Sequence, residues 1–167
     1  QKQMLGLGHA ILTGESLIGD EPFAVILADD LCDCAENGVI SQMIEIYNQY
    51  KCPIVAFEEV PLNQTSKYGI ITGKPINNSN NTYLVTDMIE KPEENSAPSN
   101  MAIIGRYILT SDIFNILRNI KPDKSGEIQI TDALKIQAKR GKVIAYKFEG
   151  KRFDCGSIRG YLEATNH

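Results

Sequence analysis

Apolar runs and helical spacings alternate in the first third of the chain. An apolar run begins at residue 23 and leads directly into Asp29 and Asp30, and the turn-forming sequence GDEP precedes it at residues 19–22. A run this short predicts a strand buried on both faces. Residues 38–49 carry apolar side chains at spacings of three and four, which predicts a helix, and residues 53–57 form a second apolar run. Strand, helix and strand in this order indicate a βαβ unit with parallel strands.

The rest of the chain continues in short elements. Residues 70–72 and 83–85 flank an asparagine-rich tip at 77–81, which predicts a hairpin whose second strand ends at Pro92. We expect a further strand over 101–109, helices over 112–119, 132–139 and 158–164, and a strand over 142–148. Thr131 is the predicted N-cap of the 132–139 helix. The pattern predicts an α/β fold with a Rossmann-like mixed, mostly parallel sheet, in a single domain over residues 1–167.

Composition and charge narrow the classes of function. The chain has 167 residues, of which 43% are hydrophobic and 23% charged, as is typical of a globular protein. Its formal net charge of −4 and pI of about 5.2 argue against nucleic acid or an anionic membrane as the main partner. No apolar stretch approaches the roughly 20 residues that span a bilayer. We expect a cytoplasmic protein whose four cysteines are reduced thiols.

Carboxylates and a lysine stand where predicted strands end. Asp29 and Asp30 end the first strand, Glu90 and Lys91 end another, and Asp154 lies in a turn before Gly156. Ligands of open α/β sheets bind beyond the carboxyl ends of the strands, and Mg²⁺ prefers carboxylates together with water and phosphate oxygens. The set therefore suits metal-assisted chemistry on a phosphorylated ligand. The alternative is structural, because Asp caps turns and a Glu-Lys pair commonly forms a solvated strand end.

Other catalytic classes are disfavoured. With two histidines, one of them at the last position, a Ser-His-Asp triad is improbable, and neither a Walker loop nor a G-x-S-x-G motif is present. The sequence GLGHAI at residues 6–11 lacks the third glycine of a dinucleotide-binding fingerprint. We interpret Gly6 and Gly8 as positions where a ligand approaches the backbone at the N-terminus of one helix that runs to about Leu17.

Seven sequence runs together resemble the bacterial UTP–glucose-1-phosphate uridylyltransferases, also called UDP-glucose pyrophosphorylases. They are GLGHA at 6–10, VILADD at 25–30, YG at 68–69, IEKP at 89–92, APSNMAIIGRY at 97–107, GEIQITDA at 126–133 and FDCG at 153–156. They occur in order over almost the whole chain, and the APSN and GEIQ runs are the most discriminating. The resemblance implies the sugar nucleotidyltransferase type of fold and Mg²⁺-dependent conversion of UTP and glucose 1-phosphate to UDP-glucose and pyrophosphate. It also implies a homo-oligomer with no nucleic-acid or membrane partner.

The resemblance also implies a role for each candidate residue. Asp29 would be the principal Mg²⁺ ligand and a catalytic residue, and Asp154 a second metal-side carboxylate. The catalytic Lys91 would hold the sugar phosphate, while Glu90 and the backbone N–H of Gly69 would contact glucose. The substrate-binding set is completed by two residues at the uracil edge, Gln1 and Gly6. Asp30 is assigned a metal-side or a turn-capping role with equal weight.

The sequence departs from the family in one large respect. A G-x-G-T-R loop that grips the triphosphate in this family is absent from the 167 residues, and so is the end of the C-terminal helical region. We therefore expect these residues to correspond to the middle and C-terminal part of the enzyme, with little activity on their own. Two alternatives stay open: a truncated, non-catalytic module that binds a sugar phosphate, and a thymidylyl- or adenylyltransferase relative.

Overall fold

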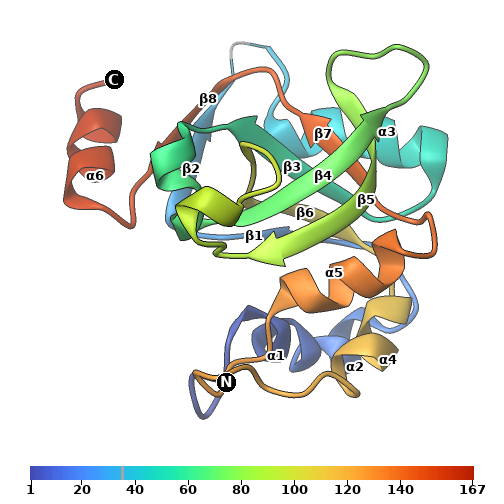
Figure 1. Ribbon diagram of the computed structural model, residues 1–167. Coiled ribbons are helices and arrows are strands. Elements are labelled where there is room, and N and C mark those ends of the chain that lie inside the picture. The colour runs from blue at the N-terminus through green and yellow to red at the C-terminus, as the bar shows by residue number, and fades with distance from the viewer. Residues whose placement is uncertain (35) are drawn as a thin grey trace.

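A computed structural model describes residues 1–34 and 36–167 (Figure 1). The helices are α1 (Leu7–Leu12), α2 (Glu15–Ile18), α3 (Val39–Tyr50), α4 (Asp112–Leu117), α5 (Ile130–Ala138) and α6 (Ile158–Thr165), with 3₁₀ turns η1 (Leu62–Lys67) and η2 (Glu94–Ser96). The strands are β1 (Phe23–Ile26), β2 (Asp30–Asp33), β3 (Ile54–Glu59), β4 (Gly69–Pro75), β5 (Thr82–Glu90), β6 (Met101–Leu109), β7 (Ile144–Lys147) and β8 (Lys151–Asp154). Most match the predicted elements within a few residues. The single helix expected after Gly6 is instead divided into α1 and α2.

The main sheet has six strands in the order β1-β6-β3-β7-β5-β4, and β4 also pairs with β6, so the sheet curls back on itself. Among the described residues every pairing in this sheet is antiparallel except β3 with β7. The prediction of a mostly parallel sheet is therefore wrong. The β1-α3-β3 unit does bring β1 and β3 into the same direction, but β6 lies between them and runs antiparallel to both. The part of the prediction that is confirmed is a mixed sheet with helices on its faces.

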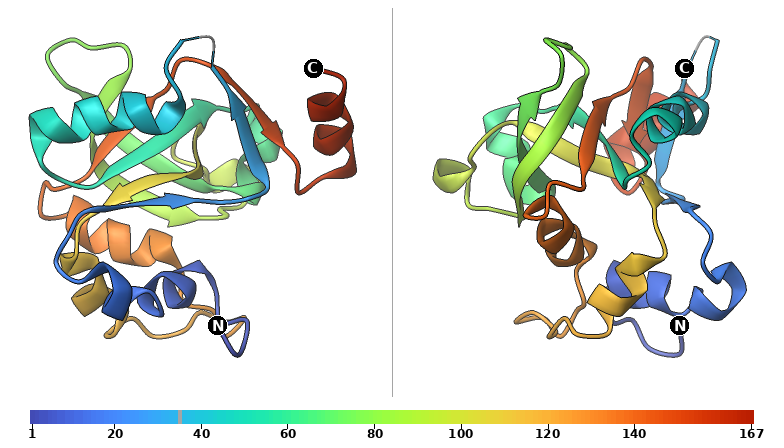
Figure 2. Two further views of the ribbon diagram at one scale, coloured as in Figure 1. Left: turned by 180° about the vertical axis from the view of Figure 1, so that it is seen from behind. Right: turned by 90° about the vertical axis from the view of Figure 1, so that its right-hand side faces the viewer.

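Helices cover the two faces of the sheet, as the two views in Figure 2 show. Helices α1, α4 and α5 lie on one side and α3 on the other, and each side has its own apolar core. Strand β3 separates the two cores, because successive side chains of a strand point to opposite faces. Val55 and Phe57 join the α4–α5 core, while Ile54 and Ala56 pack toward α3. Strand β3 is thus buried on both faces, whereas β1 is not.

The first apolar run behaves differently from the prediction. Strand β1 alternates between half-buried and exposed residues, and the side chain of Ile26 is 57% exposed. In the described part of the chain β1 pairs only with β6, so its other edge is open. The chain then turns and forms β2, which pairs with β8 as a separate two-stranded ribbon. No helix in residues 1–34 and 36–167 has the length and apolar character needed to cross a membrane.

Candidate functional site

The end of β5 brings Glu90 and Lys91 against the start of β4. Gly69 and Glu90 are register partners in the β4–β5 hairpin, and the Lys91 N–H donates to the Tyr68 carbonyl at 3.0 Å. Pro92 cannot extend the ladder, and the chain leaves the strand through Lys91, whose φ of 43° is left-handed. Non-glycine residues in this region concentrate at functional sites. The Lys91 ammonium is exposed and lies 3.9 Å from the Glu90 carboxylate.

Helix α5 contributes a second contact to Glu90. The hydroxyl of Thr131 donates to Oε2 of Glu90 at 2.5 Å. The helix N-cap is Gln129, so Thr131 lies inside the first turn and the prediction that it caps the helix is wrong. Its hydroxyl crosses to the sheet instead.

Two further carboxylates converge beside Gly156. A Cβ atom built on Gly156 would lie 3.1 Å from Oδ2 of Asp29 and 3.2 Å from Oδ1 of Asp154. The backbone holds them there, because the Cys155 N–H donates to the Asp29 carbonyl at 2.7 Å. Asp154 ends β8 and accepts hydrogen bonds from the Gly156 N–H and the Tyr68 hydroxyl, both at 3.2 Å. The side chain of Asp29 is exposed and makes no hydrogen bond or ion pair with any described residue.

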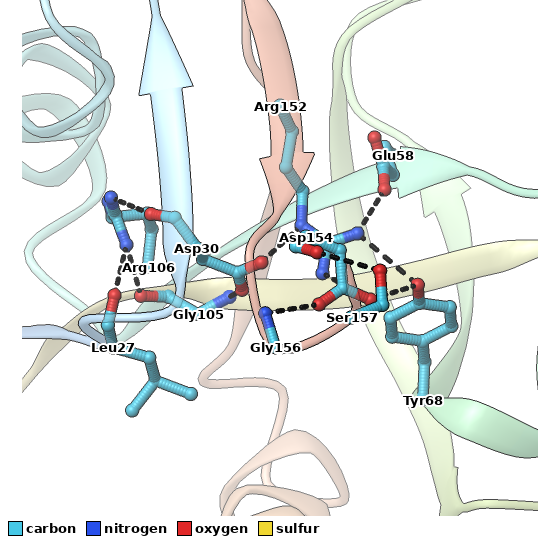
Figure 3. A network of polar contacts seen from close by, with 10 residues as sticks. All are labelled: Leu27, Asp30, Glu58, Tyr68, Gly105, Arg106, Arg152, Asp154, Gly156 and Ser157. Carbon is cyan, nitrogen blue, oxygen red and sulfur yellow. Dashed lines mark hydrogen bonds and ion pairs between the residues drawn. The ribbon is translucent and has the colours of Figure 1, made fainter. Parts of the chain in front are cut away.

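Asp30, adjacent to Asp29, has a different environment (Figure 3). Its side chain is buried, accepts a hydrogen bond from the Gly105 N–H at 2.5 Å, and forms an ion pair with Nε of Arg152 at 2.5 Å. A Cβ on Gly105 would lie 2.6 Å from Oδ2 of Asp30, so only glycine allows this approach. Asp30 therefore has a structural role, through a buried ion pair rather than the turn cap that the sequence suggested.

Arg152 is the centre of this polar network. Its side chain is 6% exposed, and it donates to Glu58 at 2.5 Å as well as to Asp30, with a longer contact to the Tyr68 hydroxyl at 3.4 Å. Burial alone would lower the pKa of Arg152, but the Tyr68 hydrogen bond and the Asp30 charge outweigh it, and the pKa lies above its ordinary value. Burial raises the pKa of Tyr68 against the opposing effect of Arg152, so its hydroxyl stays protonated and donates to Asp154.

One cavity of about 420 Å³ joins these groups. The sequence-predicted site residues that line it are Gly6, Asp29, Gly69, Glu90, Lys91 and Asp154. Burial raises the pKa of Tyr107, on the cavity wall, and the Glu90 and Asp30 carboxylates add to the effect. The predicted residues thus meet at one place although they lie up to 148 positions apart in the chain.

The remaining predicted residue, Gln1, does not line the cavity. It is exposed, and its amide donates to the Gly6 carbonyl at 2.9 Å, so it lies beside a cavity residue. Gly6 and Gly8 pack tightly on the 126–129 segment: a Cβ on either would lie within 2.8 Å of the Ile128 carbonyl oxygen. The glycines therefore accommodate another part of the backbone, in addition to any ligand.

A carboxylate pair can hold Mg²⁺ when water and phosphate oxygens complete the coordination. Among the described residues no group of three or more His, Cys, Asp or Glu side chains is arranged to hold a metal ion. Asp29 and Asp154 approach a common space that a Cβ at Gly156 would fill, so the two carboxylates fit such a shared site. The described residues therefore do not form a metal site whose ligands all come from the protein.

Comparison with known proteins assigns the chain to a protein family. The family model described as nucleotidyl transferase matches residues 1–167. The chain belongs to the nucleotidyl transferase family. It is 60% identical over 167 residues to UTP–glucose-1-phosphate uridylyltransferase of Pseudomonas aeruginosa, covering 99% of this chain and 59% of that protein. It is 44% identical over 165 residues to UTP–glucose-1-phosphate uridylyltransferase 2 of Staphylococcus saprophyticus, with 99% and 56% covered.

Solved structures agree with this nucleotidyl transferase assignment. A UDP-glucose pyrophosphorylase complexed with UDP-glucose superposes with a TM-score of 0.95 at 61% identity, over 99% of this chain and 62% of that one. A UTP-bound UGPase from Acinetobacter baumannii gives a TM-score of 0.85 at 37% identity, over 99% and 56%. The resemblance identified from the motifs is confirmed. The chain spans about 59% of the Pseudomonas relative's length.

Three site residues of this nucleotidyl transferase were missed from sequence. Tyr68 and Arg152 contact Asp154, the latter at 4.0 Å, and Thr131 contacts Glu90. Tyr68 and Thr131 lie inside motifs that carried the resemblance, and Arg152 directly precedes one. Position within a motif was therefore the available signal, but it does not reveal the contact partner.

Proposed function

We propose that this chain supplies the sugar-phosphate and metal-binding part of a nucleotidyl transferase that converts UTP and glucose 1-phosphate to UDP-glucose and pyrophosphate. The observation that carries the proposal is that one cavity is lined by Glu90, Lys91 and Gly69 together with Asp29 and Asp154. The names of the similar proteins, which are UTP–glucose-1-phosphate uridylyltransferases, support the choice of substrates.

The sugar phosphate would lie at the end of β5. Lys91 is exposed, its ammonium is 3.9 Å from Glu90, and it would bind the phosphate as a point charge. Glu90 would accept hydrogen bonds from glucose hydroxyls, and the Gly69 backbone N–H would donate to the sugar. The sugar phosphate oxygen would then attack the α-phosphorus of UTP in line, the bond from that phosphorus to the bridging oxygen would break and pyrophosphate would leave, without a covalent enzyme intermediate. The chain's contribution is positioning and charge stabilisation.

Asp29 and Asp154 would hold Mg²⁺, since both carboxylates reach the space beside Gly156. A bound Mg²⁺ neutralises phosphate charge and orients the reacting phosphates. Gly6 lines the cavity and Gln1 lies beside it, with its amide donating to the Gly6 carbonyl at 2.9 Å, and the two residues would contact the uracil edge.

A polypeptide of these 167 residues should bind glucose 1-phosphate but turn over slowly. Its sequence contains no glycine-rich loop to neutralise the triphosphate. We expect pyrophosphate release below one tenth of that of the Pseudomonas relative, a barrier difference of at least about 1.4 kcal/mol. Turnover within tenfold of the relative would refute this expectation. A full-length protein containing this chain, offered UTP, dTTP and ATP with glucose 1-phosphate, should release pyrophosphate fastest with UTP.

Isothermal titration of glucose 1-phosphate into the purified chain, with Mg²⁺ present, tests the site itself. Lys91→Gln should weaken binding about tenfold, because it removes a charge-assisted contact to the phosphate. The matched control is Lys74→Gln, which alters an exposed lysine of β4 outside the cavity. Equal affinity of the Lys91 variant and the unaltered chain would contradict the proposed phosphate position.

A further inference from the structure

Thr131 combines burial with an unusual hydrogen bond. It is 4% exposed and lies in the first turn of α5. Further inside a helix a Thr hydroxyl commonly bonds to a carbonyl of the preceding turn, but no helical turn precedes this one. Here the hydroxyl instead donates to Oε2 of Glu90 on β5 at 2.5 Å. It is the one hydrogen bond that the described residues give to the Glu90 carboxylate.

The space around this pair is open on one side because of Gly69. A Cβ at residue 69 would lie 3.1 Å from Oε2 of Glu90 and 3.1 Å from Oγ1 of Thr131. All three residues line the cavity. The other carboxylate oxygen, Oε1, lies 3.9 Å from the Lys91 ammonium, and the Glu90 side chain keeps 25% of its exposure. One oxygen is therefore fixed by Thr131, while the carboxylate keeps free acceptor capacity toward the cavity.

We infer that Thr131 is a positioning residue, whose hydroxyl holds the Glu90 carboxylate in the orientation that accepts hydrogen bonds from the hydroxyls of a sugar 1-phosphate. This rests on the proposed function, because it assumes that Glu90 faces the sugar and Lys91 the phosphate. Without the Thr131 hydroxyl, the Glu90 side chain is free to rotate about its torsions. Fixing it again when the sugar binds costs conformational entropy, which weakens the binding. The loss should fall on the sugar hydroxyls and leave the phosphate contact unchanged.

Two probes separate these contributions: glucose 1-phosphate, which carries hydroxyls and phosphate, and inorganic phosphate, which lacks the sugar. Titration calorimetry of the purified chain with Mg²⁺ would compare the unaltered chain, Thr131→Val and Thr131→Ser. The matched control is Thr82→Val, since Thr82 is 5% exposed, lies on the same strand as Glu90, and bonds Asn81 outside the cavity. We expect Thr131→Val to weaken glucose 1-phosphate binding about five- to tenfold, in line with the net contribution of one ordinary hydrogen bond.

The same variant should bind inorganic phosphate with unchanged affinity. Thr131→Ser keeps the hydroxyl and should restore glucose 1-phosphate binding, and Thr82→Val should bind both probes like the unaltered chain. Thermal melting would confirm that each variant is folded. If Thr131→Val does not fold, Thr131→Ala carries the test, because Ala is the most favourable helix residue at this position of α5.

The outcomes separate the inference from the proposed function. If the unaltered chain binds glucose 1-phosphate no better than inorganic phosphate, the proposed function and the inference that rests on it both fail. If it prefers glucose 1-phosphate and the Thr131 variants without a hydroxyl retain that preference, the inference alone is overturned. Equal losses for both probes would also overturn it, since they would indicate a general structural role.

Discussion

Replacing Asp30 by Asn should lower stability, whereas replacing the adjacent Asp29 by Asn should lower turnover and leave stability nearly unchanged. Asp30 is 6% exposed and forms an ion pair with Arg152, whose side chain is also 6% exposed. Breaking a buried pair by removing one partner costs about 3–5 kcal/mol, because the other charge remains buried. Arg152 keeps its 2.5 Å contact with Glu58, and Asn can still accept one hydrogen bond, so we expect the lower end of the range, about 3 kcal/mol.

Urea denaturation followed by circular dichroism would measure this loss for Asp30→Asn. For a chain of 167 residues, about 3 kcal/mol corresponds to a melting temperature lower by roughly 6–12 °C. Asp29→Asn should change the free energy of unfolding by less than about 0.5 kcal/mol, because that side chain is exposed and makes no hydrogen bond or ion pair with the described residues. In a full-length protein, however, Asp29→Asn should lower turnover more than tenfold. A stable Asp30→Asn variant, or an unstable Asp29→Asn variant, would refute the assignment of the two roles.

Two further predictions concern the cavity and the loop at residues 123–129. Gly69→Ala should lower the free energy of unfolding by about 1–3 kcal/mol and weaken glucose 1-phosphate binding, since its Cβ would crowd Glu90 and Thr131; Gly38→Ala, with nothing within 4 Å, is the control. The hydrogen bond from the Ser125 hydroxyl, with others from Gln129 and the Glu127 N–H, holds the pKa of Asp123 well below its usual range. Because this folded-state pKa is below the unfolded value of about 4, the ionised carboxylate stabilises the loop above that pH, and the stabilisation is lost as the pH falls through the depressed pKa. A carboxyl-carbon NMR titration should find Asp123 still ionised at pH 3, and a midpoint near 4 would contradict the loop geometry.

Elements with a strong local signal were predicted correctly. The apolar spacing over residues 38–49 became α3 (Val39–Tyr50), and the β-rich run over 101–109 became β6 (Met101–Leu109). Strand pairing was less accessible, because period and propensity do not say which strands become neighbours. The insertion of β6 between β1 and β3 therefore could not be derived from the βαβ pattern. The β2–β8 ribbon joins residues more than 100 positions apart and has no local signature.

The candidate site shows the same division. The sequence pattern singled out Asp29, Glu90 and Asp154, which line one cavity, and their roles in binding stay predictions. The separation of Asp29 from Asp30 depends on burial and on the contact with Arg152, which only the folded chain provides. Thr131 was assigned to the nearest local use of a Thr side chain, helix capping, while its actual partner lies 41 positions away. Sequence patterns thus indicate residues whose side chains could bind a ligand or a metal, and tertiary contacts decide which of them have a structural role instead.

Tyr68 shows how the fold can fix the distance between the two halves of the site. Its hydroxyl donates to Asp154 at 3.2 Å, and its backbone carbonyl accepts the Lys91 N–H at 3.0 Å. One residue therefore bridges the carboxylate pair and the lysine, and the Arg152 guanidinium lies over its ring at 5.1 Å. Arg152 in turn ties the β2–β8 ribbon to the main sheet through Glu58 on β3, and its ribbon partner Asp30 accepts the Gly105 N–H of β6. In the proposed function the lysine side holds the sugar phosphate and the carboxylate side holds Mg²⁺, so this link would help to set the distance between them.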